Sequence, residues 1–202
     1  ISACLVGSEM CIRDRFYFDL ASPLAYLAAE RIVQLLPGAH WQPVLARELG
    51  ASVDALRREA ERDAFREDVE RRARELGLMP VRWPEPFPFD STRAMLAATY
   101  AAAIGRATAF AQAAFRQAFA GGRSLADLDS ILIAGAACEM HPAAIEKALA
   151  RKPIAEQLQN ATAAARAAGV SEVPSVIVAG QTFNGERELE LAAAAASEEQ
   201  TP

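Results

Sequence analysis

Cysteine is scarce in this chain, and no two cysteines have the spacing of a redox pair. The 202 residues include Cys4, Cys11 and Cys138, with no Cys-x-x-Cys pair and no spacing typical of a metal site. We therefore expect neither disulfide exchange within the chain nor a bound metal. The low use of cysteine predicts a reducing, cytoplasmic location.

Positive charge and long apolar runs are lacking as well. The formal net charge is −5 and no basic block is present, so nucleic acid is not an expected partner. No apolar run reaches the roughly 18 residues that a membrane span requires, so a membrane partner is not expected either. What is abundant is alanine, which contributes much of the 52% hydrophobic content and predicts many helices packed through small side chains. The length allows one large domain or two interleaved small ones.

Residues 1–14 do not match the pattern of the rest of the chain. They lack the basic start and long apolar core of a signal peptide. The string from Cys4 to Asp14 resembles translated read-through of a sequencing adapter. We expect this segment to be non-native and exclude it from the fold; the alternative is a native N-terminal arm.

The chain is organised around the stretch that follows. Phe16 to Phe18 is a short aromatic run typical of a buried strand, and Ser22-Pro23 is a helix-start signal with a hydroxyl at the cap and a proline in the first turn. Apolar residues at helical spacing extend the helix to Leu36. Ser22 is therefore predicted to lie between strand and helix, where free backbone N–H groups favour an anion. Taken alone, Ser22-Pro23 is better explained by Ser22 as a simple helix cap, and the segments described below favour the anion site.

The remaining pattern predicts two β-containing segments separated by helices. Residues 40–44 are expected to form a second strand, parallel to the first across the intervening helix. Residues 47–167 are predicted to be helical throughout, apart from a proline-rich loop at 77–90. A strand at 175–179, a turn at Gly180-Gln181, a short strand at 182–183 and a closing helix from Gly185 complete the prediction.

Asp19-x-x-Ser22-Pro23 after an aromatic strand resembles the start of the 2-hydroxychromene-2-carboxylate isomerases and the kappa-class glutathione transferases. These are relatives of the DsbA-type oxidoreductases, in which this site is Cys-Pro-x-Cys. Here the two cysteine positions are occupied by Ser22 and Ala25. The resemblance implies an α/β thioredoxin-like domain, residues 15–46 and 168–202, with an inserted all-helical domain at 47–167. It also implies a homodimer.

Several further segments resemble this family and imply a site for glutathione. Arg62-x-x-Phe65-x-x-Asp68-Val69-x-Arg71 is similar to a family motif whose leading Lys lies at the glutathione site, so Arg62 is a candidate ligand. Val173-Pro174 before a strand resembles the cis-proline of thioredoxin folds, whose preceding residue pairs through its backbone with glutathione. Near the end, the segment 184–190 resembles a region that holds the γ-glutamyl group. Two alignments remain open there: in one, Arg187 occupies the position of the family's acid, and in the other Glu186 supplies that acid.

The proline-rich loop is predicted to form an apolar wall for a flat substrate. Trp83, Phe87 and Phe89 lie on a segment that prolines stiffen. The loop resembles a family loop in which Asn is usual at the position of Asp90, which lacks an amide donor. Asp90 is thus either a substrate-binding residue or, with Ser91, a cap for the next helix. Leu24 replaces a tyrosine that the family often carries and is expected to face the substrate.

These observations predict a glutathione-dependent isomerase acting on an aromatic enone-acid, with Ser22 stabilising a glutathione thiolate. The alternatives are a kappa-like glutathione transferase, which would share every site residue, and a non-enzymatic protein that binds glutathione or another thiol. An oxidoreductase of the DsbA type is disfavoured because both thiol positions are replaced.

Overall fold

The computed structural model describes residues 14–50 and 59–199. Its strands are β1 (Arg15–Phe18), β2 (His40–Pro43), β3 (Ser175–Val178) and β4 (Gln181–Asn184). Its α-helices are α1 (Pro23–Leu35), α2 (Glu59–Glu75), α3 (Thr92–Ala103), α4 (Ala107–Phe115), α5 (Leu128–Ala136), α6 (Pro142–Leu149), α7 (Lys152–Ala167) and α8 (Leu189–Glu199). Shorter helical turns are η1 (Ala46–Glu48), η3 (Arg116–Ala120), which is π-helical, and η4 (Glu186–Glu188). Residues 1–13, residues 51–58 of the predicted helical region and residues 200–202 lie outside the described residues.

The four strands form one mixed sheet in the order β2-β1-β3-β4. β1 pairs in parallel with β2, and α1 connects them, which confirms the predicted strand-helix-strand unit. β3 runs antiparallel to β1 and continues into β4 through a tight turn. This turn consists of Ala179 and Gly180, both at positive φ (50° and 78°), whereas the sequence had suggested Gly180-Gln181. Gln181 instead pairs with Val178 in the ladder.

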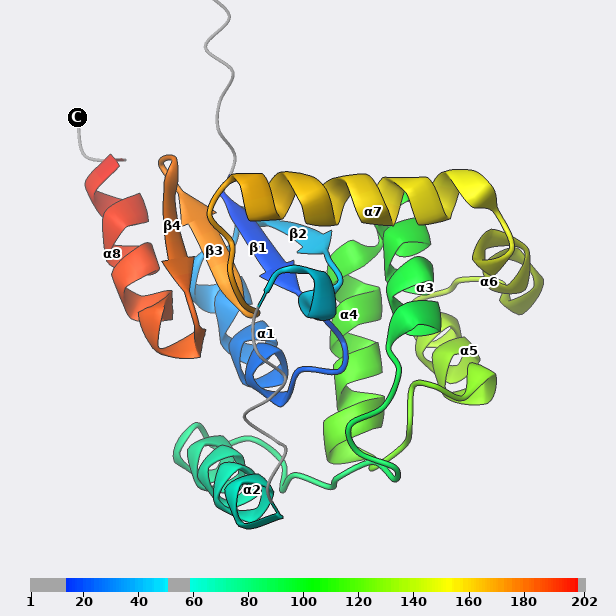
Figure 1. Ribbon diagram of the computed structural model, residues 1–202, viewed down its shortest axis with the longest axis horizontal. Coiled ribbons are helices and arrows are strands. Elements are labelled where there is room, and N and C mark those ends of the chain that lie inside the picture. Colours follow the sequence, from blue (N-terminus) through cyan, green and yellow to red (C-terminus); the bar gives the residue numbers. More distant parts are fainter. Residues whose placement is uncertain (1–13, 51–58, 200–202) are drawn as a thin grey trace, which may run out of the picture.

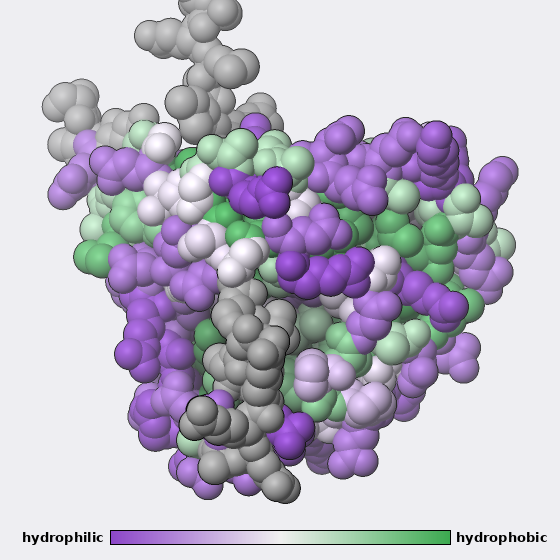
Figure 2. Space-filling model, viewed as in Figure 1, coloured by the Kyte–Doolittle hydropathy of each residue, from purple (hydrophilic) through white to green (hydrophobic). Residues whose placement is uncertain are grey.

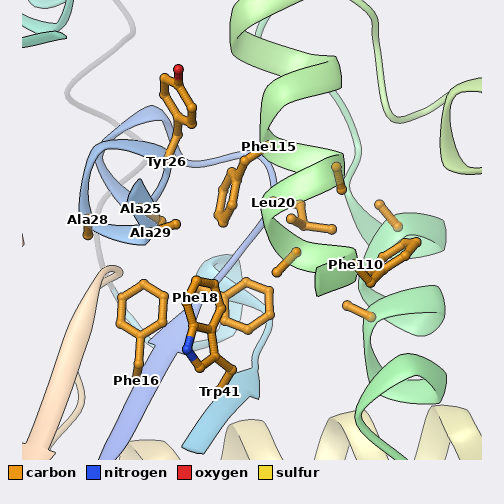
Figure 3. Packing of buried hydrophobic residues seen from close by; sticks show 14 of the residues in the cluster. Phe16, Phe18, Leu20, Ala25, Tyr26, Ala28, Ala29, Trp41, Phe110 and Phe115 are labelled. Carbon is orange, nitrogen blue, oxygen red and sulfur yellow. The ribbon is translucent and has the colours of Figure 1, made fainter. Parts of the chain in front are cut away.

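Both faces of the central strands are buried. Phe16 and Phe18 point to the face covered by α1 and α4, where Phe16 lies edge-on to Trp41 at 4.8 Å and Phe18 lies 6.0 Å from Phe115 (Figure 3). Tyr17, between them, points to the opposite face and packs with residues from the end of α7. Because β1 is buried on both sides, a continuous aromatic run is the pattern it requires.

The helices between β2 and β3 pack through small side chains, as the alanine content predicted. Figure 1 shows α3 and α4 beside the sheet, α7 running across it, and α2 set apart near the start of α1. Gly105, at a φ of 74°, separates α3 from α4. One hydrophobic cluster joins strands and helices without interruption, so the proposed division at residues 47 and 167 stays a prediction.

The outer surface is polar where helices meet solvent. Figure 2 shows hydrophilic side chains covering the exposed side of α7. Within residues 14–50 and 59–199, none of the helices combines the length and the apolar character needed to cross a membrane.

Candidate functional site: an apolar cavity at the start of α1

Ser22 caps α1, as the sequence predicted. Its backbone is extended (φ −91°, ψ 114°), its Oγ accepts a hydrogen bond from the Ala25 amide at 3.1 Å, and Pro23 is the first helical residue. In the first turn, Pro23 has no amide hydrogen and the Ala25 amide is bound by Ser22. The Leu24 amide is therefore the first-turn donor that remains for a ligand. The positive end of the helix dipole therefore lies at Ser22.

Val173 and Pro174 lie directly against this helix start. The Val173-Pro174 peptide is cis, as predicted, and the Ser22 hydroxyl donates to the Val173 carbonyl oxygen at 3.4 Å. These residues are 151 positions apart in sequence. At 3.4 Å this hydrogen bond is long for an O–H donor, so the hydroxyl can turn to a better acceptor at little cost.

A cavity of about 490 Å³ opens beside Ser22. Six segments line it: the connection from β1 to α1, the first two residues of α1, η1, one residue of α2, the proline-rich loop with Ser91 after it, and the residues before β3. Of the predicted site residues, the structure brings Ser22, Leu24, Phe87, Asp90 and Val173 together here. Such a volume suits a small molecule, and the lining is mainly apolar.

Two rings from the proline-rich loop form part of the wall, but Trp83 does not. Phe87 and Phe89 line the cavity, whereas Trp83 lies behind Phe87, with their ring centroids 5.0 Å apart. The Trp83 indole N–H donates to Glu70 of α2 at 2.7 Å, which turns the ring away from the cavity. Phe65 of α2, which the sequence singled out only as part of a motif, lines the cavity instead.

Asp90 has the helix-capping contacts that were one of its two predicted roles. Its Oδ1 accepts from the Thr92 amide at 2.9 Å and from the Thr92 hydroxyl. These hydrogen bonds, and the nearby Arg47 guanidinium, lower the pKa of Asp90 below its usual value. Asp90 also lines the cavity, so the structure leaves the capping and the substrate-binding interpretations compatible.

Arg62, Glu186 and Arg187, three predicted glutathione ligands, are not among the residues lining the cavity. Glu186 is buried, with 5% of its surface exposed, and forms ion pairs with Arg31 of α1 and Arg72 of α2. Glu186 therefore joins three elements of the fold. Arg187, its neighbour, is exposed. A role for these residues in binding glutathione stays a prediction.

Sequence analysis missed Asp19 as a site residue. Asp19 lines the cavity three residues before Ser22, and only 4% of its surface is exposed. Its two carboxylate oxygens accept from the amides of Ala21 and Ala46, each at 2.9 Å. Burial raises the pKa of this carboxyl group, although the backbone hydrogen bonds partly counteract that effect. The sequence did contain a signal for Asp19, which is an acid directly after an apolar strand. An aspartate at such a position is seldom buried unless its carboxylate has partners in the fold.

Arg47 was missed as well. It belongs to η1, lines the cavity, and donates from Nη1 to the Thr92 hydroxyl at 2.8 Å and to Asp90 at 3.3 Å. Nothing local in the sequence marks Arg47, since its approach to Asp90 depends on the folding of segments 43 residues apart.

The described part of the chain contains no cluster of three or more His, Cys, Asp or Glu residues that could hold a metal ion. Cys138, its one cysteine, is buried within the helical region, and burial raises the pKa of its thiol. The site therefore offers a hydroxyl, backbone groups and a mostly apolar surface, but no thiol of its own.

Comparison with known proteins identifies the family and the fold to which this chain is similar. A family model described as a DSBA-like thioredoxin domain matches residues 15–196. A solved structure of 2-hydroxychromene-2-carboxylate isomerase superposes with a TM-score of 0.80 at 20% identity, covering 92% of this chain and 94% of that one. A probable DsbA oxidoreductase from Streptomyces coelicolor gives a TM-score of 0.76 at 17% identity, covering 94% and 92%.

A third neighbour was solved with a ligand. The cytosolic disulfide reductase DsbM from Pseudomonas aeruginosa, in a structure with GSH, gives a TM-score of 0.62 at 14% identity, covering 93% of this chain and 97% of that one. A search of curated proteins found no match. The structural likenesses concern the fold, and they confirm the thioredoxin-like fold expected from the sequence. Because the family model spans nearly all of the described residues, the chain belongs to the family of DSBA-like thioredoxin domains.

Proposed function

We propose that this protein is a glutathione-dependent isomerase of the 2-hydroxychromene-2-carboxylate isomerase type. The observation that carries the proposal is the position of the Ser22 hydroxyl. It lies at the N-terminus of α1, beside the Val173 carbonyl, and lines a mainly apolar cavity. A hydroxyl donor at the positive end of a helix is suited to stabilising a thiolate that another molecule supplies.

The residues around Ser22 fit glutathione as the source of that thiolate. In the proposal, Val173 pairs through its backbone with the peptide of glutathione, and Ser22 turns its hydroxyl from the Val173 oxygen toward the sulfur. A free thiol has a pKa of about 8.5, so only a few per cent is ionised at neutral pH. The Ser22 hydroxyl and the Leu24 amide would raise that fraction by lowering the thiol pKa.

Glutathione, when bound, supplies a nucleophile that adds reversibly to an activated double bond, which permits rotation and then elimination without net oxidation or reduction. The chain's own contribution is to hold the thiolate and to enclose the substrate. Leu24, Phe65, Phe87 and Phe89 offer an apolar surface for an aromatic enone-acid. Packing of these side chains against the substrate would keep water from the reacting carbon atoms. Elimination to the isomer is then favoured over side reactions with water.

The fold comparisons support this choice among the functions of the family. One neighbour is a 2-hydroxychromene-2-carboxylate isomerase, and another was solved with GSH. The absence of thiols at Ser22 and Ala25 disfavours the oxidoreductase chemistry of other members. A kappa-like glutathione transferase is the second candidate, because it needs the same thiolate at the same cavity. A protein that binds glutathione without turnover is the third.

Turnover assays with glutathione separate these candidates. An isomerase regenerates its glutathione, so catalytic amounts should convert a chromene carboxylate completely, with no lasting conjugate. A transferase should consume glutathione one for one with an electrophile such as a chloro-dinitroarene. Binding of glutathione without either reaction would support the non-enzymatic alternative and contradict the isomerase proposal.

A cytoplasmic location and a homodimer also stay with this proposal as predictions. A glutathione-dependent reaction is suited to a reducing compartment. Sedimentation of the purified protein would test the dimer, and a monomer at working concentration would contradict it.

A further inference from the structure

The charged side chains of the cavity are unequal in what they can offer a ligand. Among its described lining residues, Asp19, Asp90 and Glu172 are acids, and Arg47 is the one cation. Asp19 is buried, with both oxygens already bonded to amides. Within the described part of the lining, an anionic group that enters this cavity therefore meets one side chain of opposite charge, which is Arg47.

Arg47 is held at the edge of the cavity. The amide of the preceding residue, Ala46, donates to the buried Asp19 carboxylate at 2.9 Å, which fixes the backbone of η1. The guanidinium is anchored at its other end by Thr92 and Asp90 through Nη1. Nε lies 3.9 Å from Glu48, too far for a hydrogen bond. A guanidinium has five N–H donors in a rigid fork, so these contacts use only part of its capacity.

We propose that Arg47 binds a carboxylate at the mouth of the cavity, and so makes the site selective for acids with a flat apolar body. The rings of Phe87 and Phe89 would pack against that body, while the guanidinium fork donates two hydrogen bonds to the carboxylate oxygens. This inference rests on the proposed function for the kind of ligand, and it assigns the selectivity to a residue that the sequence did not indicate.

Asp90 limits how strong this contact can be. It is an anion that already shares Nη1 of Arg47, and the Arg47 side chain is 52% exposed. Solvent screening and the competing carboxylate both weaken a new ion pair. We therefore expect the acid to bind about tenfold more tightly than its neutral partner. That ratio corresponds to the free energy of about one charge-assisted hydrogen bond.

The carboxylate could belong to the aromatic substrate or to glutathione itself, because the chemistry of recognition is the same. The two sources can be separated by titration calorimetry, which needs no turnover. The first arm compares cinnamate with its neutral amide, cinnamamide, without glutathione. The second compares glutathione with its glycine ethyl ester, without the aromatic ligand. Failure of the isomerase proposal would leave both arms interpretable.

Three variants complete the design. Arg47→Gln removes the charge, and Arg47→Lys keeps the charge but loses the fork. Arg93→Gln is the matched control, since Arg93 is an exposed arginine of α3 that does not line this cavity. Circular dichroism would establish that each variant is folded.

We expect the wild-type protein and Arg93→Gln to prefer the acid over its neutral partner by about tenfold in one arm. Arg47→Gln should abolish that preference by weakening the binding of the acid while leaving the binding of the neutral ligand unchanged. Arg47→Lys should retain part of the preference. The arm that responds identifies the source of the carboxylate. No preference in the wild type, an unchanged preference in Arg47→Gln, or equal weakening of the acid and neutral ligands would overturn the proposal.

Discussion

Replacement of Asp19 by Asn tests whether this buried carboxylate holds the cavity together. In the wild type, one oxygen accepts from the Ala21 amide and the other from the Ala46 amide, each at 2.9 Å. Asparagine has the same shape but only one acceptor oxygen, so its NH₂ group must face one of these amides. One hydrogen bond is lost and one buried donor is left unsatisfied, which together cost about 1–3 kcal/mol of the free energy of unfolding.

The pH dependence of this difference has a defined sign. Burial raises the pKa of Asp19 in the folded protein, so the folded state holds its proton to a higher pH than the unfolded state does. The contribution of Asp19 to stability is thus full below its unfolded pKa and declines as pH rises through the folded pKa. Since Asn does not titrate, the advantage of the wild type over Asp19→Asn should narrow over that range.

Urea unfolding of both proteins would measure this difference at a series of pH values from about 4 to about 8. This range covers the ordinary titration of a carboxyl group and the region above it. Asp129→Asn is the control, because Asp129 is an exposed acid of α5 and its loss should cost only a few tenths of a kcal/mol. Equal stability of Asp19→Asn and wild type, or an advantage that widens as pH rises, would refute the reasoning.

Two further predictions concern the framework of the site. Glu186→Gln should lower the free energy of unfolding by about 1–3 kcal/mol, because Arg31 and Arg72 lose their shared buried anion and keep only the more exposed Glu190 and Asp68. Urea unfolding would measure this loss, and an unchanged midpoint would contradict it. Phe119→Ala should cost about 3–5 kcal/mol, since Phe119 is fully buried and its ring stacks on Tyr26 at 5.6 Å. Thermal unfolding tests it, and a loss below about 1 kcal/mol would mean that the core closes around the gap.

Local sequence signals specified the start of the site because they act over a few residues. Ser22-Pro23 carries its own physical reason for ending a loop and beginning a helix, and the structure has the cap at that residue. The cis peptide at Val173-Pro174 was implied by the resemblance of this segment to the cis-proline of thioredoxin folds. Both are statements about backbone geometry, which short patterns constrain strongly.

Side-chain direction in the loop could not be predicted in this way. A stiff loop limits its own backbone, but the side on which Trp83 lies depends on where its indole N–H finds an acceptor. That acceptor is Glu70 on α2. Phe87 and Phe89 line the cavity, whereas Trp83, which the sequence assigned to the same wall, does not, and Phe65 lines the cavity instead. That these rings bind a substrate stays a prediction.

Charged residues were the hardest to place, since their environment is set by contacts between distant segments. Glu186 looked like a ligand-binding acid, yet arginines from α1 and α2 converge on it. Asp19 and Arg47 face the cavity only because the connection after β1, η1 and the start of α3 meet there. No periodicity or spacing within one segment reports such a meeting.

The pKa of the glutathione thiol bound to the wild-type protein and to Ser22→Ala is the measurement that tests the central claim most directly. It can be followed by the ultraviolet absorbance of the thiolate as a function of pH, at protein concentrations that saturate glutathione. Ser22→Thr is the control, because it keeps a hydroxyl at the cap. Comparing the stability of the two variants accounts for the ~1 kcal/mol that loss of the cap costs in Ser22→Ala. We predict that the wild-type protein and Ser22→Thr lower the thiol pKa below its free value of about 8.5, and that Ser22→Ala binds glutathione but raises the pKa by about one unit. Identical titration curves for the wild type and Ser22→Ala would contradict the role of Ser22 as the group that stabilises the thiolate.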